Sequence, residues 1–536
     1  MKVEPECVFL RQSVLRPTCN YIVGAQTSRG GLAIIQYFAA GARIPGHFRP
    51  HPTTPIGLNT TEVQRELGCR VSNTTAIFGP SDSRFDVATS RWDIYAPPQI
   101  QVVIEPGQES DVSTIVKYCN ENSIEFLALN GGHGFTHSLG TFNGIQINLV
   151  NLQKITIQPS GKTAWFGGGV VDGPVTSYLW DHGYVTTTGT CDCVGLMGAA
   201  LGGGHGRHQG LYGMASDNIR QLNVVLADGK AIRVSERSYS DLFWAMKGAG
   251  HNFGIVTSAE MNIFPRGPDT WHYHNYVWRG DKLEVLFSTL NAFHNNGSTP
   301  VNMTTNLGNI SMNTTISKEE PVISWNFAYR GSAKAAEQLL TPFNAIEAAY
   351  EESGDIPYPE ISVAQQTDIN SFVCQNGYVR VTATAGLQVY NVTAERQIYQ
   401  GFVDRLASNP TLAAGVAILH EGYSTAGVTA QDPDDSAYPF RADNHLNLFQ
   451  ITIASGDPSL KQAAQEWAAE VRDQWNNGQP GRLENVYVNY ATGLEPIENI
   501  YGHELWRLER LRTLKRCYDP YNRFRFYNPI IGRGEH

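Results

Sequence analysis

The 536-residue sequence lacks the features of membrane and nucleic-acid-binding proteins. No stretch approaches the roughly 18 consecutive apolar residues that a membrane-spanning helix needs. No run of lysine and arginine occurs, and the formal net charge is −10, so we expect no nucleic-acid partner and no membrane association. The G-x-x-x-x-G-K-[ST] motif of nucleotide-binding P-loops is also absent. The composition, with 41% hydrophobic residues, is that of a globular enzyme.

Cysteine is scarce, since eight cysteines are too few for a disulfide scaffold in a chain of this size. The opening residues, MKVEPECVFL, lack the basic-then-apolar order of a signal peptide. Asn-x-Ser/Thr sequons favour the secretory route instead, and we predict a secretory or extracellular protein. The candidate glycosylation sites are Asn59, Asn73, Asn296, Asn302, Asn309, Asn313 and Asn391.

The apolar periodicity predicts an α+β chain. Residues 1–60 are irregular and are predicted to be an N-terminal extension, followed by a glycine-rich domain over 61–267. In this domain Val112, Ile115, Val116 and Cys119 recur at helical spacing, and 144–150 (GIQINLV) alternates like a half-buried strand. The stretch LADGKAIRV at 226–234 predicts a hairpin around Asp228-Gly229. Residues 268–480 alternate strands with amphipathic helices at 394–408 and 459–476, which predicts an antiparallel sheet backed by helices. The last part, 481–536, contains a predicted helix near 502–516.

Three glycine clusters stand out, at 129–140 (LNGGHGFTHSLG), 197–213 (MGAALGGGHGRHQGLYG) and 246–254 (MKGAGHNFG). Glycine lets backbone N–H groups approach a ligand, and successive N–H groups form an anion-binding nest. The clusters therefore indicate a phosphate or pyrophosphate site, and the alternative is a set of tight turns between strands. A Rossmann site is a weaker interpretation, because GGGHGRHQG follows no clear strand.

The stretch GTCDCVG at 189–195 holds two cysteines, and three interpretations are open. Cys191 and Cys193 could bind a metal with His205 and His208, although the spacing fits no familiar zinc pattern. They could form a strained disulfide with each other. One of them could be a thiol that reacts with a bound cofactor.

In combination these motifs resemble the berberine bridge enzyme-like branch of the FAD-linked oxidases, in the vanillyl-alcohol oxidase superfamily, and its fungal members most of all. The resemblance rests on six stretches spread from 131 to 524: GGH at 131–133, GTCDCVG at 189–195, LGGGHGRHQGLYGMASDN at 201–218, DLFWAMKGAGHNFGIVTS at 241–258, YVNY at 487–490 and RLERLRTLKRCYDPYNRF at 507–524. It implies a two-subdomain FAD-binding domain of the PCMH type, a substrate domain over 268–480, and a C-terminal segment that returns to the FAD domain.

The resemblance also implies that FAD is held covalently. By position, His133 would bind the flavin 8α carbon, and Cys191 would bind flavin carbon 6, although Cys193 stands where relatives usually have another residue. Many relatives carry a basic residue where this chain has Leu129. The other implied cofactor-binding residues are Gly131, Gly132, Gly134, Gly195, Gly203, Gly204, His205, Asn252, Gly254 and Val256.

For catalysis the resemblance points to Tyr490 as the base, with Asn489 near the flavin and Gln450 facing the ring. A tyrosine base needs a lowered pKa, so a cation or hydrogen-bond donor is expected beside Tyr490. Glu421 is interpreted as a structural acid. The family also implies a disulfide between Cys69 and Cys119.

We therefore expect a monomeric FAD-dependent oxidoreductase that oxidises a small secondary metabolite, with O2 as the electron acceptor. Oligosaccharides are the alternative substrates. A redox-neutral isomerase or cyclase on the same scaffold, and a non-catalytic flavin-binding protein, are the remaining hypotheses.

Overall fold

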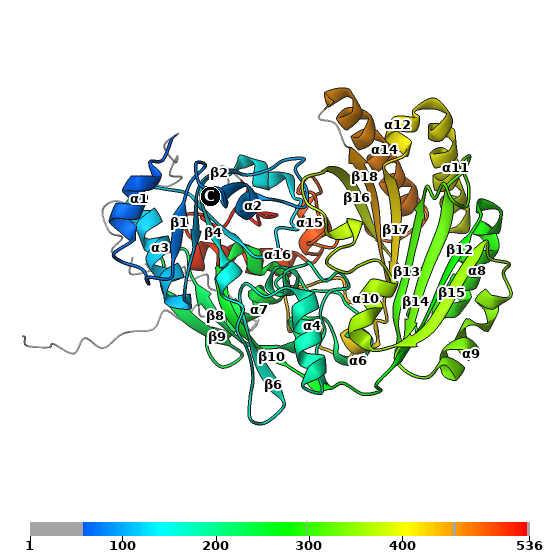
Figure 1. Cartoon of the computed structure of the whole chain (residues 1–536), viewed down its shortest axis with the longest axis horizontal. Helices are drawn as coiled ribbons and strands as arrows, with labels where there is room; N and C mark the ends of the chain where they lie inside the picture. The colour runs from blue at the N-terminus through cyan, green and yellow to red at the C-terminus, as the bar shows by residue number, and fades with distance from the viewer. Residues whose placement is uncertain (1–56, 296, 454–456, 533–536) are drawn as a thin grey trace, which may run out of the picture. The chain divides into compact units, whose positions relative to one another are not determined.

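Four β-sheets and their helices organise the part of the chain that the structure describes (Figure 1). This computed structural model describes residues 57–295, 297–453 and 457–532. The predicted extension over 1–60 falls almost wholly outside these ranges, as does the sequon at Asn296. The mixture of helices and sheets confirms the α+β class. The domain boundaries after 60, 267 and 480 stay predictions.

The first sheet has the strand order β1-β2-β4-β3, with β1 antiparallel to β2 and the other pairs parallel. Its elements are β1 Ala76–Phe78, β2 Gln99–Glu105, β3 Phe126–Leu129 and β4 Asn143–Asn148, with α1 Thr60–Leu67, α2 Phe85–Thr89 and α3 Glu109–Glu121. The predicted apolar stripe of α3 is confirmed, because Val112, Ile115, Val116 and Cys119 are fully buried. The first glycine cluster follows β3 directly, at the carboxyl end of a parallel strand, where open sheets bind ligands.

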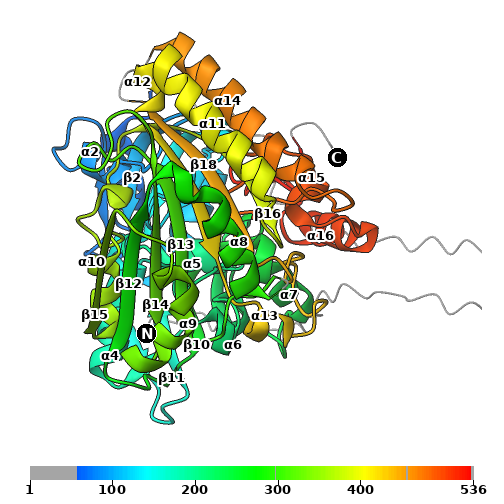
Figure 2. The same ribbon diagram turned by 90° about the vertical axis from the view of Figure 1, so that its right-hand side faces the viewer.

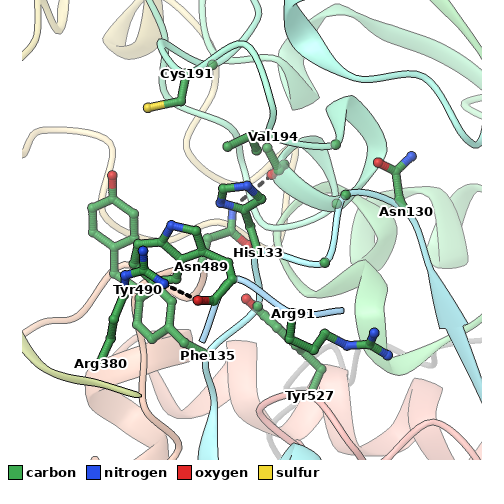
Figure 3. A pocket seen from close by; sticks show the side chains of 18 of the residues that line it. Arg91, Asn130, His133, Phe135, Cys191, Val194, Arg380, Asn489, Tyr490 and Tyr527 are labelled. Atoms are coloured by element: carbon green, nitrogen blue, oxygen red, sulfur yellow. Dashed lines mark hydrogen bonds between the residues drawn. The ribbon is translucent and has the colours of Figure 1, made fainter. Parts of the chain in front are cut away.

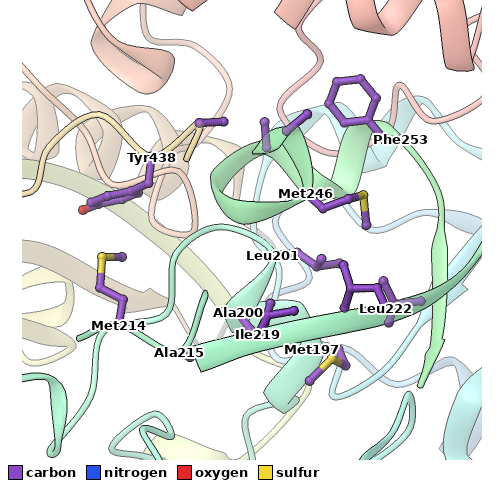
Figure 4. Packing of buried hydrophobic residues seen from close by; sticks show 14 of the residues in the cluster. Met197, Ala200, Leu201, Met214, Ala215, Ile219, Leu222, Met246, Phe253 and Tyr438 are labelled. Carbon is purple, nitrogen blue, oxygen red and sulfur yellow. The ribbon is translucent and has the colours of Figure 1, made fainter. Parts of the chain in front are cut away.

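The second sheet is antiparallel, in the order β5-β6-β10-β8-β9. The elements of this part are β5 Ile155–Ile157, β6 Thr163–Gly167, β7 Tyr184–Val185, β8 Ile219–Val225, β9 Ala231–Ser235, β10 Ile255–Asn262 and β11 Phe264–Pro265, with α4 Asp172–Asp181, α5 Leu196–Ala200, α6 Gln209–Tyr212 and α7 Ser240–Ala249; β7 and β11 form a small sheet of their own. The predicted hairpin between β8 and β9 turns at Gly229, whose φ is +82°. Figure 4 shows the core beside this sheet, where Leu201 lies between Met246 of α7 and Leu222 of β8.

The third large sheet has seven strands, in the order β15-β12-β14-β13-β17-β18-β16, and every neighbouring pair is antiparallel. Its strands are β12 Trp271–Trp278, β13 Met303–Ser311, β14 Val322–Tyr329, β15 Tyr350–Ile356, β16 Val379–Leu387, β17 Val416–Gly422 and β18 His445–Ile453. The helices are α8 Leu283–His294, α9 Ala333–Asn344, α10 Ile361–Ala364, α11 Val392–Ser408, α12 Pro410–Ala413, α13 Ala426–Thr429 and α14 Pro458–Asn477. Figure 2 shows α8, α11 and α14 over one face, which confirms the predicted sheet backed by helices.

Strand alternation gives this sheet two different faces. Ile418 of β17 and Phe449 of β18 are direct neighbours and pack with Trp467 of α14 on the helix-covered face. The residues that alternate with Ile418 along β17, and with Phe449 along β18, point to the opposite face. Glu421 of β17 and Gln450 of β18 therefore face away from the helices, into the cavity described below.

The C-terminal segment, with α15 Ile497–Tyr501 and α16 Leu505–Tyr518, is tied to the first two sheets by buried polar contacts. Lys515 Nζ donates to the carbonyl of Asn252, just before β10, at 2.7 Å, and pairs with Asp519 at 2.7 Å. Arg525 pairs with Glu125, just before β3, at 2.7 Å. These contacts hold residues 515–525 beside the first two sheets.

Among the described residues we find no helix with the length and apolar character that a membrane crossing requires.

Candidate active site

A cavity of about 740 Å³ is lined by the glycine loops, by the open face of β17 and β18, and by the C-terminal segment (Figure 3). Pockets for cofactors and small ligands typically measure about 300–1,000 Å³. The structure brings most of the predicted site residues to the wall of this one cavity. They are Gly131, Gly132, His133, Gly134, Cys191, Gly195, His205, Gly254, Val256, Gln450, Asn489 and Tyr490.

Two glycine loops meet back to back at this wall. A side chain on Gly131 would place its Cβ 2.6 Å from the backbone nitrogen of Gly195, so both loops need bare backbone to approach each other. Gly132 has a φ of +74°, in the left-handed region that favours glycine. Asn130, which precedes Gly131, donates its amide N–H to the carbonyl of Val170 at 3.2 Å and so links the first loop to the segment after β6. Bare backbone at Gly131 therefore lets the two loops approach each other closely, and the anion nest stays a prediction.

His133 follows these glycines into the cavity. Burial and the charge of Arg380 lower the pKa of His133 to about 4, so the imidazole is neutral at physiological pH. The ring stacks on Trp92 with the centroids 5.6 Å apart. A neutral imidazole keeps an unprotonated nitrogen that can form a bond to a cofactor.

The structure resolves the question of the paired cysteines. Cys193 forms a disulfide with Cys374, 181 residues further along the chain, which brings the loop at 189–195 against the segment after α10. Cys191 keeps a free thiol and lines the cavity. Both the Cys191–Cys193 disulfide and the metal site are excluded, because Cys193 is already bonded. Burial, with a smaller effect of Glu421, raises the pKa of Cys191 to about 12, so the thiol holds its proton until a base removes it.

The implied disulfide between Cys69 and Cys119 is wrong. Both residues are free thiols in the structure. Cys119 is fully buried in the apolar core under α3, whereas Cys69 is exposed just after α1. The apolar stripe of α3 explains the position of Cys119, which serves as a small core residue.

A carboxylate and two tyrosines form the most concentrated polar group in the cavity wall. Tyr490 donates its hydroxyl to Glu421 Oε1 at 2.7 Å, and Tyr423 donates to Oε2 at 2.9 Å. Burial raises the pKa of Glu421 above its ordinary value, and the two hydrogen bonds partly oppose this rise. Burial and the neighbouring carboxylate raise the pKa of Tyr490 well above its ordinary value.

Tyr490 contacts an anion and its pKa rises, which is the opposite of the effect expected from a neighbouring cation or hydrogen-bond donor. Glu421, interpreted from the sequence as a structural acid, lines the cavity beside Tyr490. The sequence shows Glu421 only as part of the strand VAILHEG, and no local signal distinguishes it.

Asn489 and Gln450 both reach the cavity. Asn489 donates its amide to the carbonyl of Ala199 at 2.9 Å and to the hydroxyl of Tyr487 at 2.7 Å, whereas its buried Oδ1 has no partner among the described residues. Gln450 donates to Thr452 Oγ1 at 3.2 Å. This oxygen packs against Gly202 and does not face the open cavity.

Three predicted cofactor residues do not line the cavity: Gly203, Gly204 and Asn252. Asn252 donates to the hydroxyl of Tyr501 at 3.0 Å and accepts from the backbone of Ile530 at 3.1 Å, so it anchors the C-terminal segment. His205 lines the cavity, but its nitrogens already bind Gln209 at 2.9 Å and Tyr438 at 2.8 Å. We conclude that Asn252 has a structural role, which corrects the prediction for this residue.

The wall also contains a cationic residue that no sequence motif indicated. Arg91 lines the cavity and is 4% exposed. Burial lowers the pKa of Arg91 to about 10, so it stays positively charged at neutral pH. Its hydrogen-bond partners among the described residues are the carbonyls of Thr89 and Ser90 and the amide of Gln146, none of them anionic. Arg91 therefore supplies a positive charge in the cavity wall.

Among the described sequon residues, Asn309 is a poor acceptor for a glycan. It lines the cavity, and its Oδ1 is buried. This position corrects the prediction for Asn309. Glycosylation at the other described sequons stays a prediction; they are Asn59, Asn73, Asn302, Asn313 and Asn391.

The wall as a whole fits FAD. Bare glycine loops and the unpaired charge of Arg91 suit a pyrophosphate. Residues 100–235 match the FAD binding domain family, and residues 486–531 match the family described as berberine and berberine like. FAD is therefore the cofactor of this chain.

The FAD-linked oxidoreductase anuG of Penicillium roqueforti is 50% identical over 94% of this chain and 98% of its own length. Among solved structures, the BBE-like 1 protein of Physcomitrella patens has a TM-score of 0.73 and 19% identity, covering 87% of this chain and 98% of that one. Glucooligosaccharide oxidase from Acremonium strictum, described with 6-S-cysteinyl, 8α-N1-histidyl FAD, has a TM-score of 0.71 and 20% identity, covering 88% and 99%. The similarity to anuG over nearly the whole of both chains identifies this protein as an oxidoreductase. The chain belongs to the fungal FAD-linked oxidoreductases of the berberine bridge enzyme-like family.

Proposed function

We propose that the chain oxidises a small secondary metabolite with FAD bound in this cavity. The observation that carries the proposal is the convergence of His133, Cys191 and the Glu421–Tyr490 pair on one cavity wall. FAD, when bound, supplies the acceptor for a hydride from a substrate C–H bond. The side chains around it must hold the cofactor, orient the substrate and take a proton from it.

His133 and Cys191 would hold the cofactor covalently. His133 is neutral and follows the glycine loop, so its ring enters the cavity where the backbone can bind the pyrophosphate. Cys191 is free because its neighbour Cys193 is bonded to Cys374. The histidyl and cysteinyl bonds described for glucooligosaccharide oxidase support the same pair of anchors here.

Glu421 would accept the substrate proton, with Tyr490 as the relay. With its raised pKa, Tyr490 does not lose a proton on its own at neutral pH. It can pass its hydroxyl proton to Glu421 Oε1, 2.7 Å away, while its oxygen takes the proton of a substrate hydroxyl or C–H group. Tyr423 keeps the second carboxylate oxygen in place. The carboxylate ends protonated and the phenol unchanged.

The wall favours a compact, partly aromatic substrate. Trp92, Phe135, Met312, Phe372 and Tyr378 bring large apolar groups to the cavity. Such surfaces bind ring systems by stacking and apolar contact. Oligosaccharides are the second candidate, supported by the fold shared with glucooligosaccharide oxidase.

We further propose that O2 is the electron acceptor and that the enzyme is monomeric. We also propose that the protein follows the secretory route, where the Cys193–Cys374 disulfide would form.

Anaerobic reduction of the flavin tests the proposal. The purified enzyme is mixed without oxygen with a panel of phenolic, alcoholic and amine ring compounds and, separately, with gluco-oligosaccharides. We expect a ring compound to bleach the flavin band, and added O2 to restore the band with one hydrogen peroxide per turnover. Product formation without bleaching would establish a redox-neutral reaction instead, and bleaching by oligosaccharides alone would establish the second candidate.

A further inference from the structure

Two histidines and a glutamate converge outside the cavity, on the helix-covered side of the seven-stranded sheet. His272 and His274 lie two residues apart on β12 and therefore share one face of the strand. Glu337 reaches them from α9, which lies beside β12 in Figure 1. Glu337 Oε1 is 2.8 Å from His272 Nε2 and 2.8 Å from His274 Nδ1. We propose that these three residues bind a divalent transition-metal ion, with zinc as the ion that best fits the set.

The ligand set is chemically suited to zinc. Two imidazole nitrogens and one carboxylate oxygen form a three-ligand zinc site that leaves a fourth position for water. Zinc bonds of about 2.0–2.2 Å in a tetrahedron place the ligand atoms about 3.3–3.4 Å apart. The ligand atoms here all lie within 4.8 Å of one another, and both nitrogen–oxygen contacts are 2.8 Å. The tetrahedron therefore requires these two contacts to open by about 0.5 Å and the widest separation to close by up to about 1.5 Å, which rotation of the side chains can supply.

The groups behind the ligands strengthen the argument. His272 directs its other nitrogen, Nδ1, to Asp355 on β15 at 2.9 Å. His274 directs Nε2 toward Glu351 at 3.6 Å. A metal-bound histidine characteristically gives its remaining N–H to a carboxylate, which fixes the tautomer. Asn344 donates to Glu337 Oε2 at 2.8 Å and leaves Oε1 aimed at the two rings.

The carboxylate oxygens on both sides of the His272 ring also require a cation beside it. Both nitrogens of His272 face carboxylate oxygens, and a nitrogen lone pair cannot face a carboxylate lone pair without a cation between them. Either a proton or a metal ion must therefore lie between His272 and Glu337. One zinc ion replaces both shared protons of the two rings and fastens α9 to β12. His272 is 6% exposed and Glu337 is 33% exposed at its side chain, so an ion can enter from solvent past the glutamate.

Zinc binding by the full-length, FAD-loaded enzyme tests the proposal. The protein is dialysed against a chelator and then titrated with ZnSO4 by calorimetry, and bound zinc is counted by mass spectrometry. We expect one zinc per chain, and a double variant, His272→Asn with His274→Asn, that binds at least 100-fold more weakly. Asp355→Asn should weaken binding by about 10–100-fold, as the loss of a carboxylate behind a metal-bound histidine does.

The matched control is His182→Asn, because His182 is an exposed histidine that contacts the carbonyl of Tyr178 and lies outside the cluster. It should bind zinc like the wild type. Flavin content and melting temperature show whether each variant folds. Wild-type protein that takes up no zinc, or no more than the double variant, would overturn the proposal, and so would a loss of binding in His182→Asn equal to that in the double variant.

Discussion

The change of Glu421 to glutamine tests the proposed proton acceptor. Glutamine has nearly the same shape, and its one amide oxygen can accept the hydrogen bond of either Tyr490 or Tyr423, whereas its NH2 group only donates and the side chain cannot take a proton. Loss of a general base costs about 10²–10⁴-fold in rate, or about 2.7–5.4 kcal/mol of barrier at about 1.36 kcal/mol per decade. We expect the rate of anaerobic flavin reduction by substrate to fall by that factor in Glu421→Gln.

Stability should change far less than activity. Each phenol hydrogen bond to a charged carboxylate is worth about 1.5–3 kcal/mol and each bond to a neutral amide about 0.5–1.5 kcal/mol, while the variant also removes the cost of burying a charge. The two effects oppose each other, so the melting temperature should stay close to that of the wild type. Glu260→Gln is the matched control, because Glu260 accepts from Thr163 at 2.7 Å on β10 and does not line the cavity.

The pH dependence gives a second measure of the same residue. Burial raises the pKa of Glu421, so the active carboxylate is lost as the pH falls through a value above the ordinary carboxyl range. Tyr490→Phe removes a hydrogen bond that lowers this pKa, and the acid limb of kcat/KM should move to higher pH. Wild-type reduction rates in Glu421→Gln, or an acid limb that moves to lower pH in Tyr490→Phe, would refute the role of Glu421.

Two further predictions concern the frame around the cavity. Cys374→Ser removes the disulfide that joins positions 181 residues apart, and the lost loop-closure restraint costs about 5 kcal/mol of stability. The half-life of activity on heating should therefore shorten. An unchanged half-life would contradict this prediction. Arg441→Met leaves the buried Asp217 without the ion pair that it forms at 2.7 Å, at a cost of about 3–5 kcal/mol, and calorimetry should show a lower melting temperature. The double variant Arg441→Met with Asp217→Leu should recover most of the loss. Equal losses in the single and double variants would contradict this prediction.

The sequence predicted those parts of the fold whose signal is local. The helical spacing of Val112, Ile115, Val116 and Cys119 and the turn at Gly229 depend on a few neighbouring residues, and both are confirmed. The glycine clusters likewise predict places where the backbone approaches a neighbouring group closely. At Gly131 a side chain is excluded because the backbone of Gly195 lies too close.

The remaining features depend on residues far apart in the chain. Glu421 reaches Tyr490 only because the sheet order places β17 between β13 and β18, so that one alternate set of its residues faces the cavity. Cys193 finds Cys374 across 181 residues without any local pattern. Arg91 precedes β2 by several residues and enters the cavity through tertiary packing alone.

The central claim is that His133 and Cys191 anchor the flavin, and retention of colour after denaturation tests it most directly. The wild type, His133→Ala, Cys191→Ala and the double variant are denatured in acid and pelleted, and flavin absorbance is measured in the pellet. We predict that flavin stays with the wild-type polypeptide, that each single variant keeps part of it, and that the double variant releases all of it. Flavin that washes out of the wild type would contradict the account.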